Sequence, residues 1–428
     1  MTPFLLIFVF FSTLLIGVPI AFCLGFTGLV GLWHAGVITL QLVPQRIFTG
    51  MDLFPLMAIP LFILAGSLME AGGITQRLIT FSNLLVGHFR GGLAHTSIVS
   101  SMFISGISGA GVADAAAVGS ILIPAMKKEG YDVDFAAAVV AAASVNGPII
   151  PPSITMVVYA CTVGVSVGGL FLAGFIPGLF LGLGLTGVVW VLGRSRSFPG
   201  RRERARLREI LRGSRDAILA LMMPALIMGG ILSGIFTATE AAAIAVLYAF
   251  LVGTLIYREI HLSQLNRILI DSGLTTSVIL FIIGTANILA WVLAAQQVPQ
   301  RLSAFFLSLG SNPYFILFLV NLFLLLVGMF METGAAVILL SPILHPALVS
   351  LGLHPLHVGL VFVLNLSIGL ITPPVGVCLF VSSAIGGISI EKLTRAILPF
   401  MVVEVAVLLL VSFLPQTVLL FPKVFGYA

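Results

Sequence analysis

The sequence predicts an all-α integral membrane protein with two inverted repeats, each containing a re-entrant helical hairpin and a broken transmembrane helix. Three observations predict this fold class. The 428 residues are 59% apolar and 8% charged, with a mean hydropathy of +1.20, whereas soluble domains carry about 25% charged residues. Several apolar stretches are long enough to cross a bilayer. Glycine and proline positions recur at one fixed offset along the chain.

The composition excludes a cytosolic enzyme, a disulfide-stapled secreted domain and a nucleic-acid binder. Nine of the 20 lysine and arginine residues lie in the window 194–215, which has a net charge of +7. Because positive charge beside membrane spans marks the cytoplasmic side, we expect this loop in the cytoplasm. The three cysteines lie in apolar runs and show no spacing typical of a metal site or a disulfide framework.

The spans follow from apolar stretches of about 20 residues. The stretch 3–38 is too long for one span, and Gly17-Val18-Pro19 marks a natural break in it. Amphipathic segments at 73–92 and 258–271 predict helices that lie along the membrane interface. The clear spans are 53–72, 170–192, 217–236, 239–257, 273–295 and 395–421.

An internal repeat is the most informative feature of the chain. At an offset of 222 residues the matching pairs are Pro124 and Pro346, Gly130 and Gly352, Gly147 and Gly369, Pro151 and Pro373, and Pro152 and Pro374. Each repeat contains five crossings if 3–38 forms two short spans and the hairpin returns to its own side. An odd number of crossings inverts the second repeat, which is typical of secondary transporters.

Each repeat contains a polar hairpin tip and a proline-rich helix break. The first repeat has a tip at 105–114 and a break at 146–153, and the second has them at 328–334 and 369–376. Freed backbone groups cost several kcal/mol each in hydrocarbon, so these segments must be buried in protein or line a wet cavity. Their unpaired carbonyls are the oxygen ligands that sodium takes in transporters.

Four acidic residues within the apolar chain are candidates for function because intramembrane charge is expensive. Asp114 and Glu332 lie at the two hairpin tips, where we expect ion-binding or substrate-binding roles. Glu240 follows Thr237 with the spacing of a helix cap, and Glu404 has no visible partner. The sequence contains no nucleophile, nucleotide or metalloprotease motif, so we predict that the protein is not an enzyme.

Several motifs together resemble the large membrane subunit of TRAP (tripartite ATP-independent periplasmic) transporters of the dicarboxylate and sialic acid type. They are Gly17-Val18-Pro19-Ile20-Ala21-Phe22, the tip 105–114 with 115–119, Gly-Pro-Ile-Ile-Pro-Pro-Ser at 147–153, and 369–376. The resemblance covers essentially the whole chain. It implies an elevator-type transport domain, sodium coupling, a separate four-helix membrane subunit, a periplasmic substrate-binding protein and a location in the bacterial inner membrane.

The resemblance also implies site residues. The first sodium site uses Ser108 with the carbonyls of Gly147, Ile150 and Pro152. Repeat symmetry extends this to a second sodium site, with the ligands Glu332, Thr333, Gly334, Gly369, Thr372 and Pro374. Asp114 is expected near the substrate cavity, and Ser105 and Asn146 are assigned to the substrate with it.

The expected function is sodium-coupled import of a small organic acid such as a C4-dicarboxylate or a sialic acid. The alternative is a self-sufficient secondary anion symporter with the same inverted hairpins and no binding protein. No lysine or arginine occurs at 91–126 or 302–391. A carboxylate would therefore meet hydroxyls, backbone N–H groups, helix N-termini and bound sodium.

The elevator interpretation divides the chain into alternating parts. Residues 94–167 and 313–387 form the transport domain, each with a hairpin and a broken helix. The scaffold comprises 1–93 with the first arm, 168–312 with the basic loop 194–215 and the second arm, and the C-terminal span 388–428.

Overall fold

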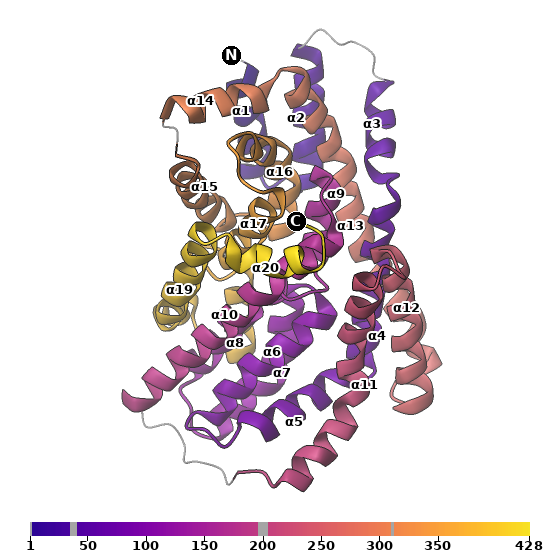
Figure 1. The fold of residues 1–428 in the computed structure, drawn as a ribbon, viewed down its shortest axis with the longest axis vertical. Helices are drawn as coiled ribbons and strands as arrows, with labels where there is room; N and C mark the ends of the chain where they lie inside the picture. The colour runs from indigo at the N-terminus through magenta and orange to yellow at the C-terminus, as the bar shows by residue number, and fades with distance from the viewer. Residues whose placement is uncertain (1, 35–40, 196–203, 310–311) are drawn as a thin grey trace.

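The computed structural model describes residues 2–34, 41–195, 204–309 and 312–428, and all regular secondary structure there is helical (Figure 1). Seven of these helices are long and apolar enough to cross a membrane. The predicted all-α membrane fold is confirmed. Residues 196–203 of the basic loop lie outside the described residues.

The helices follow one another in the same order in the two halves of the chain. The first half contains α1 Thr2–Leu15, α2 Ile20–His34, α3 Leu42–Met51, η1 Phe54–Met57, α4 Ala58–Ala71, α5 Ile74–Val86, α6 Gly92–Ser108, α7 Gly111–Lys128, α8 Val133–Ser144, α9 Ile154–Val163 and α10 Val167–Ser195. The second half contains α11 Leu207–Leu232, α12 Ala238–Leu251, η2 Val252–Ile256, α13 Leu262–Ala295, α14 Val298–Leu309, α15 Pro313–Gly328, α16 Thr333–Ser350, α17 Pro355–Gly369, α18 Val377–Gly386, α19 Ile390–Phe413 and α20 Gln416–Val424.

The repeat offset of 222 residues is confirmed in the helix boundaries. Shifted by that offset, α7 coincides with α16 at both ends. Figure 1 shows the first hairpin, α6 and α7, in the lower half of the molecule and the second, α15 and α16, in the upper half. The hairpins therefore enter from opposite ends, as inverted repeats require.

Two helix predictions have different outcomes. Gly17-Val18-Pro19 separates α1 from α2, so the division of 3–38 into two helices is confirmed. The separate interfacial helix at 258–271 is wrong, because residues from Leu262 onward belong to the continuous helix α13. Pro55 interrupts the first repeat between α3 and α4, whereas the equivalent position in α13 is Ser277, which lets the helix continue. The element equivalent to α5 is α14.

The helices form two packing groups joined by two arms. We call α1–α4 and α11–α13 the frame, because α13 packs on α2, α3 and α4 and α12 packs on α4. We call α6–α10 and α15–α20 the hairpin body, because α7, α8 and α18 pack together, α17 packs on α15 and α16, and α10 and α19 contact both α8 and α17. The arms α5 and α14 contact both groups.

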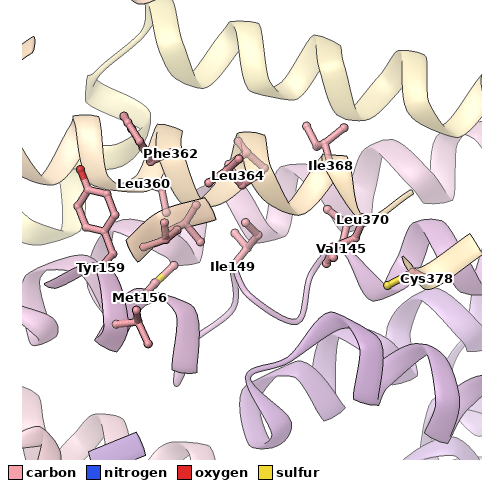
Figure 2. Packing of buried hydrophobic residues seen from close by; sticks show 14 of the residues in the cluster. Val145, Ile149, Met156, Tyr159, Leu360, Phe362, Leu364, Ile368, Leu370 and Cys378 are labelled. Carbon is pink, nitrogen blue, oxygen red and sulfur yellow. The ribbon is translucent and has the colours of Figure 1, made fainter. Parts of the chain in front are cut away.

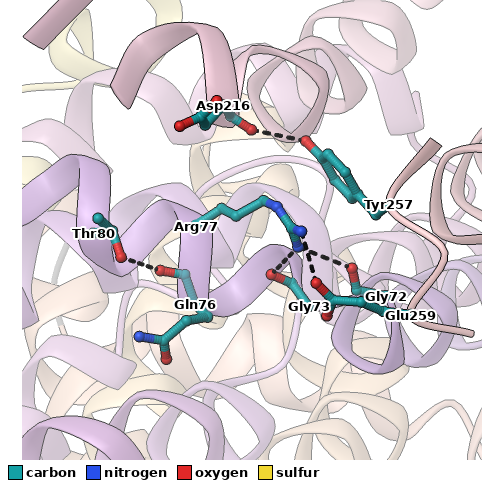
Figure 3. A network of polar contacts seen from close by, with 8 residues as sticks. All are labelled: Gly72, Gly73, Gln76, Arg77, Thr80, Asp216, Tyr257 and Glu259. Carbon is teal, nitrogen blue, oxygen red and sulfur yellow. Dashed lines mark hydrogen bonds and ion pairs between the residues drawn. The ribbon is translucent and has the colours of Figure 1, made fainter. Parts of the chain in front are cut away.

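An ion pair and an aromatic ring hold the arm α5 to the frame (Figure 3). Arg77 Nη2 lies 2.6 Å from Glu259 Oε1, and the guanidinium lies 3.8 Å from the centroid of the Tyr257 ring. Arg77 Nη1 donates to the Gly73 carbonyl at 2.9 Å, and Tyr257 Oη donates to the Asp216 carbonyl at 2.9 Å. One side chain therefore links α5 to the connection between α12 and α13.

We expect Arg77→Ala to loosen the arm. The Arg77 side chain is 25% exposed, so its ion pair and ring contact together stabilise the docked arm by about 1–2 kcal/mol. Hydrogen exchange of the α5 amides should accelerate, and the thermal midpoint in detergent should fall. Arg267→Ala is the matched control, because its pair with Asp271 is 88% and 62% exposed and contributes little. Equal effects of the two changes would contradict this account of the arm.

Candidate functional site

The tip of the first hairpin brings three predicted residues together. Asp114, in the first turn of α7, is fully buried. Ser105 Oγ donates a hydrogen bond of 2.7 Å to Asp114 Oδ2, and Ser108 Oγ donates to Oδ1. The chain can turn between α6 and α7 because Gly109 adopts the left-handed conformation, with φ of 62°. The tip is thus a buried carboxylate held by two hydroxyls.

The first helix break leaves backbone carbonyls without hydrogen-bond partners, as the sequence predicts. Among the described residues, the carbonyls of Gly147, Ile150 and Pro152 accept no hydrogen bond. Asn146 Nδ2 donates to the Ala143 carbonyl at 3.2 Å, while its buried Oδ1 has no partner. Ser153 starts α9 as its cap by accepting a hydrogen bond from the Met156 amide. The break therefore holds several oxygen atoms available for a ligand.

The second tip and break contain the same kinds of group with more internal bonding. Glu332 is exposed and caps α16 by accepting a hydrogen bond from the Ala335 amide at 3.0 Å. Thr333 is buried and donates to the Leu366 carbonyl at 3.3 Å. The Gly369 carbonyl accepts from the Thr372 amide, and Thr372 Oγ1 donates to the Ile368 carbonyl.

The remaining predicted oxygens of this second set lie close by. Gly334 follows Glu332 at the start of α16, and the Pro374 carbonyl accepts no hydrogen bond in the described part of the chain. The Pro151–Pro152 and Pro373–Pro374 peptide bonds are both cis. The two breaks therefore share this backbone geometry at equivalent positions.

Each tip lies directly against the break of its own repeat. A Cβ atom on Gly147 would lie 2.7 Å from the Gly111 nitrogen, and one on Gly369 would lie 2.5 Å from the Gly328 carbonyl. The second break also reaches the first tip, since a Cβ on Gly111 would lie 3.0 Å from Leu370 Cδ1, and Figure 2 shows Leu370 close to Val145, the residue before the first break. The structure thus brings the separate predicted segments into one cluster at the centre of the hairpin body.

A cavity of about 210 Å³ lies between the first hairpin, the frame and the arm α5. Ser108 and Asp114 line it from the hairpin, while Ser105 and Asn146 do not. Sequence reasoning missed the opposite wall, where the polar lining is Ser67, Glu70, Thr75 and Thr275. Glu70 lies inside the predicted span 53–72, so the rarity of intramembrane charge could have revealed it. No lysine or arginine of the described chain lines this cavity.

Three further titratable residues, Glu240, Glu404 and His345, lie outside the tips and breaks. Glu240 and Thr237 form a capping box at the start of α12, which confirms the predicted cap. Glu404 is fully buried on α19, and neither carboxylate oxygen has a hydrogen-bond partner among the described residues. His345 Nδ1 lies 2.7 Å from Tyr159 Oη. No group of three metal-ligating side chains occurs in the described ranges.

The inverted hairpins, paired breaks and cavity beside the frame define an integral membrane transport protein. The family model described as tripartite ATP-independent periplasmic transporter, DctM component, matches residues 7–417. The chain belongs to this family, as predicted. It is therefore a transport protein rather than an enzyme, and a multi-pass protein of the bacterial inner membrane.

Curated relatives support the same family. A C4-dicarboxylate TRAP transporter large permease of Pseudomonas aeruginosa is 42% identical, over 89% of both chains. A sialic acid TRAP transporter large permease of Vibrio cholerae is 39% identical over 98% of this chain and 99% of its own. The crystal structure of the Alcanivorax borkumensis YdaH transporter has the same fold at 15% identity, with a TM-score of 0.65 and coverage of 88% and 87%.

We expect Gly147→Ala and Gly369→Ala to push each tip away from its break. A side chain there would overlap backbone atoms, and such overpacking costs about 1–3 kcal/mol. The thermal midpoint in detergent should fall for both variants. Gly229→Ala and Gly273→Ala are matched controls because a Cβ at these helical positions meets nothing within 4 Å. Midpoints equal to the controls would show that the tips do not depend on this close approach.

Proposed function

We propose that the protein is the large permease of a sodium-coupled TRAP transporter that imports a small organic acid delivered by a periplasmic binding protein. The observation that carries this proposal is the central cluster, in which the Ser108–Asp114 tip lies against a break with free carbonyls. Sodium prefers such oxygen ligands. The proposed first site is Ser108 Oγ with the carbonyls of Gly147, Ile150 and Pro152, and the second uses the equivalent tip and break.

Relatives support the substrate class. The names of relatives specify C4-dicarboxylate, sialic acid and, for an Escherichia coli permease 36% identical to this chain, 2,3-diketo-L-gulonate. All three are carboxylates, whereas the isethionate named for a relative 38% identical to this chain is a sulfonate. We infer that this protein also transports a carboxylate, which would lie in the cavity beside Ser108 and Asp114 with sodium supplying positive charge.

A relative also supports the partners. An isethionate TRAP transporter permease named DctMQ from Oleidesulfovibrio alaskensis is 38% identical over 98% of this chain, which spans 66% of its length. Part of that longer permease therefore lies outside the region equivalent to this chain. We infer that a small membrane subunit and a binding protein complete the transporter.

Uptake in proteoliposomes tests the proposal. The assay combines the permease, its small subunit and its binding protein with radiolabelled succinate, N-acetylneuraminate or 2,3-diketo-L-gulonate. We expect one acid to accumulate only with an inward sodium gradient and only with the binding protein present. Equal uptake without the binding protein would favour the self-sufficient symporter instead.

We expect Ser108→Ala and Thr372→Val to weaken sodium activation. Each change removes one oxygen ligand worth about 1 kcal/mol, so the half-saturating sodium concentration should rise about five-fold. Because Ser108 Oγ also donates to Asp114 and Thr372 Oγ1 to the Ile368 carbonyl, the thermal midpoint in sodium-free buffer should fall slightly, and the added stabilisation by sodium should be lost. Ser120→Ala is the matched control, since Ser120 lies on the exposed face of α7. Unchanged sodium activation in both variants would remove the support for these sites.

The proposed mechanism is an elevator, in which the hairpin body moves against the frame. Both breaks and both tips are joined within the body, whereas the contact of its first hairpin with α4 and α5 is interrupted by a cavity. The packing favours including α10 and α19 in the moving part, although the sequence assigns them to the scaffold. The boundaries 94–167 and 313–387 remain a prediction for the core of that part.

A cross-link between body and frame should stop transport. Ala110→Cys and Ser67→Cys face one cavity, and a short bifunctional thiol reagent would join them after Cys23, Cys161 and Cys378 are replaced by serine. We expect uptake to fall below about a tenth of the rate before cross-linking, while the binding protein still docks. The control pair Gly25→Cys and Thr285→Cys lies within the frame, where a Cβ on Gly25 would approach Thr285 to 3.5 Å. Full uptake after complete cross-linking of the first pair would exclude the elevator.

A further inference from the structure

A second cavity lies between the frame and the second hairpin. Its volume is about 270 Å³, and α3, α13, α14 and α16 form its walls. An adjoining hollow of about 180 Å³ shares Asn287, Ala290 and Pro342 with it. Figure 1 shows α3, α14 and α16 in the upper half of the molecule, whereas α5 and the start of α11 lie at the lower end. This second cavity therefore faces away from the basic loop 194–215.

The chemistry of this cavity differs from that of the cavity beside Asp114. Its polar lining consists of Arg46, Asn287 and Trp291, which carry N–H donors, and no acidic residue of the described chain lines it. The Arg46 guanidinium lies 5.2 Å from the centroid of the Trp291 ring. Arg46 forms no ion pair with a described residue, and the Asn287 amide forms no hydrogen bond there.

A half-buried guanidinium held over an aromatic ring is prepared for an anion. The ring contact restricts the guanidinium, so less side-chain freedom is lost when a carboxylate accepts two parallel N–H bonds. The adjacent Asn287 amide supplies another donor toward the same space. The volume is close to the lower end of the range for small-molecule sites, about 300–1,000 Å³.

We propose that Arg46, Asn287 and Trp291 form an outer recognition site for the carboxylate of the transported acid. This inference rests on the proposed function. Arg46 supplies the positively charged side chain that the hairpin regions lack. The outer cavity then presents a guanidinium to the acid, whereas the inner cavity is lined by the carboxyl side chains of Glu70 and Asp114 and needs sodium to hold an anion.

Protection of Arg46 from chemical modification tests binding without any variant. Sealed proteoliposomes with the basic loop inside are treated with phenylglyoxal, which modifies arginine, and the Arg46 peptide is quantified by mass spectrometry. The probe is whichever of succinate, N-acetylneuraminate or 2,3-diketo-L-gulonate is taken up, with the matching amide as the uncharged control. We expect the acid to slow modification of Arg46 at least about five-fold and the amide to have no effect.

A phosphate headgroup of a lipid shares this anion chemistry, and the same assay separates the two sources. If modification of Arg46 is slower in vesicles than in detergent and the acid slows it no further, the inference is overturned in favour of a lipid site. Equal modification of Arg46 with and without the acid would also overturn it.

Transport kinetics of variants provide a second test. We expect Arg46→Gln to raise the half-saturating acid concentration for uptake about ten-fold or more, because a charge-assisted pair of hydrogen bonds is lost. Arg46→Lys keeps the charge without the fork and should have an intermediate effect. Half-saturating sodium, and the half-saturating acid concentration for efflux from the loop side, should not change. Arg301→Gln is the matched control, since Arg301 is exposed on α14 and does not line the cavity.

The outcomes distinguish this inference from the proposed function. Sodium-dependent uptake with an unchanged half-saturating acid concentration in Arg46→Gln would overturn the outer site and leave the proposed function standing. Absence of sodium-dependent uptake by the unmodified protein, with all three acids, would overturn the proposed function and the inference with it.

Discussion

Backbone groups released by the hairpin tips and helix breaks must be accommodated inside the protein, because hydrocarbon offers no hydrogen-bond partner. The structure meets this constraint by placing each tip against the break of its own repeat. The approach is so close at Gly147 and Gly369 that a side chain would overlap backbone atoms of the tip. The burial of these polar segments therefore creates the cluster of oxygens that we propose as the ion site.

The same constraint explains why the hairpin body is one unit. The tip of the first hairpin contacts Leu370 in the second break, and Val145, directly before the first break, lies close to the same residue. Separating the repeats would expose carbonyls of both breaks to lipid. The frame has its own interruption at Pro55, between α3 and α4, but none of the tips and breaks of the central cluster lies in it. The proposed movement therefore follows the surface between frame and body. The cavities beside the two hairpins lie along this surface.

Much of this arrangement could be predicted from the sequence, because glycine and proline mark the unusual backbone. Gly17 and Pro19 mark the division between α1 and α2, and the pairs Pro151–Pro152 and Pro373–Pro374 reveal the repeat. The continuous helix α13 was missed because its first turns are amphipathic and resemble an interfacial segment. The frame side of both cavities was also missed, since residues such as Thr275 and Asn287 approach the hairpins only through tertiary packing and follow no local pattern.

The continuity of α13 sets a length scale for the proposed movement. Thr275 of this helix lines the inner cavity and Asn287 lines the outer one. Twelve residues separate them, and at a rise of 1.5 Å per residue their positions are about 18 Å apart along the axis. In the proposed elevator, a substrate that passes from the outer cavity to the inner one would therefore move about this distance along α13. Because α13 is one continuous helix, the frame fixes the separation of the two cavities.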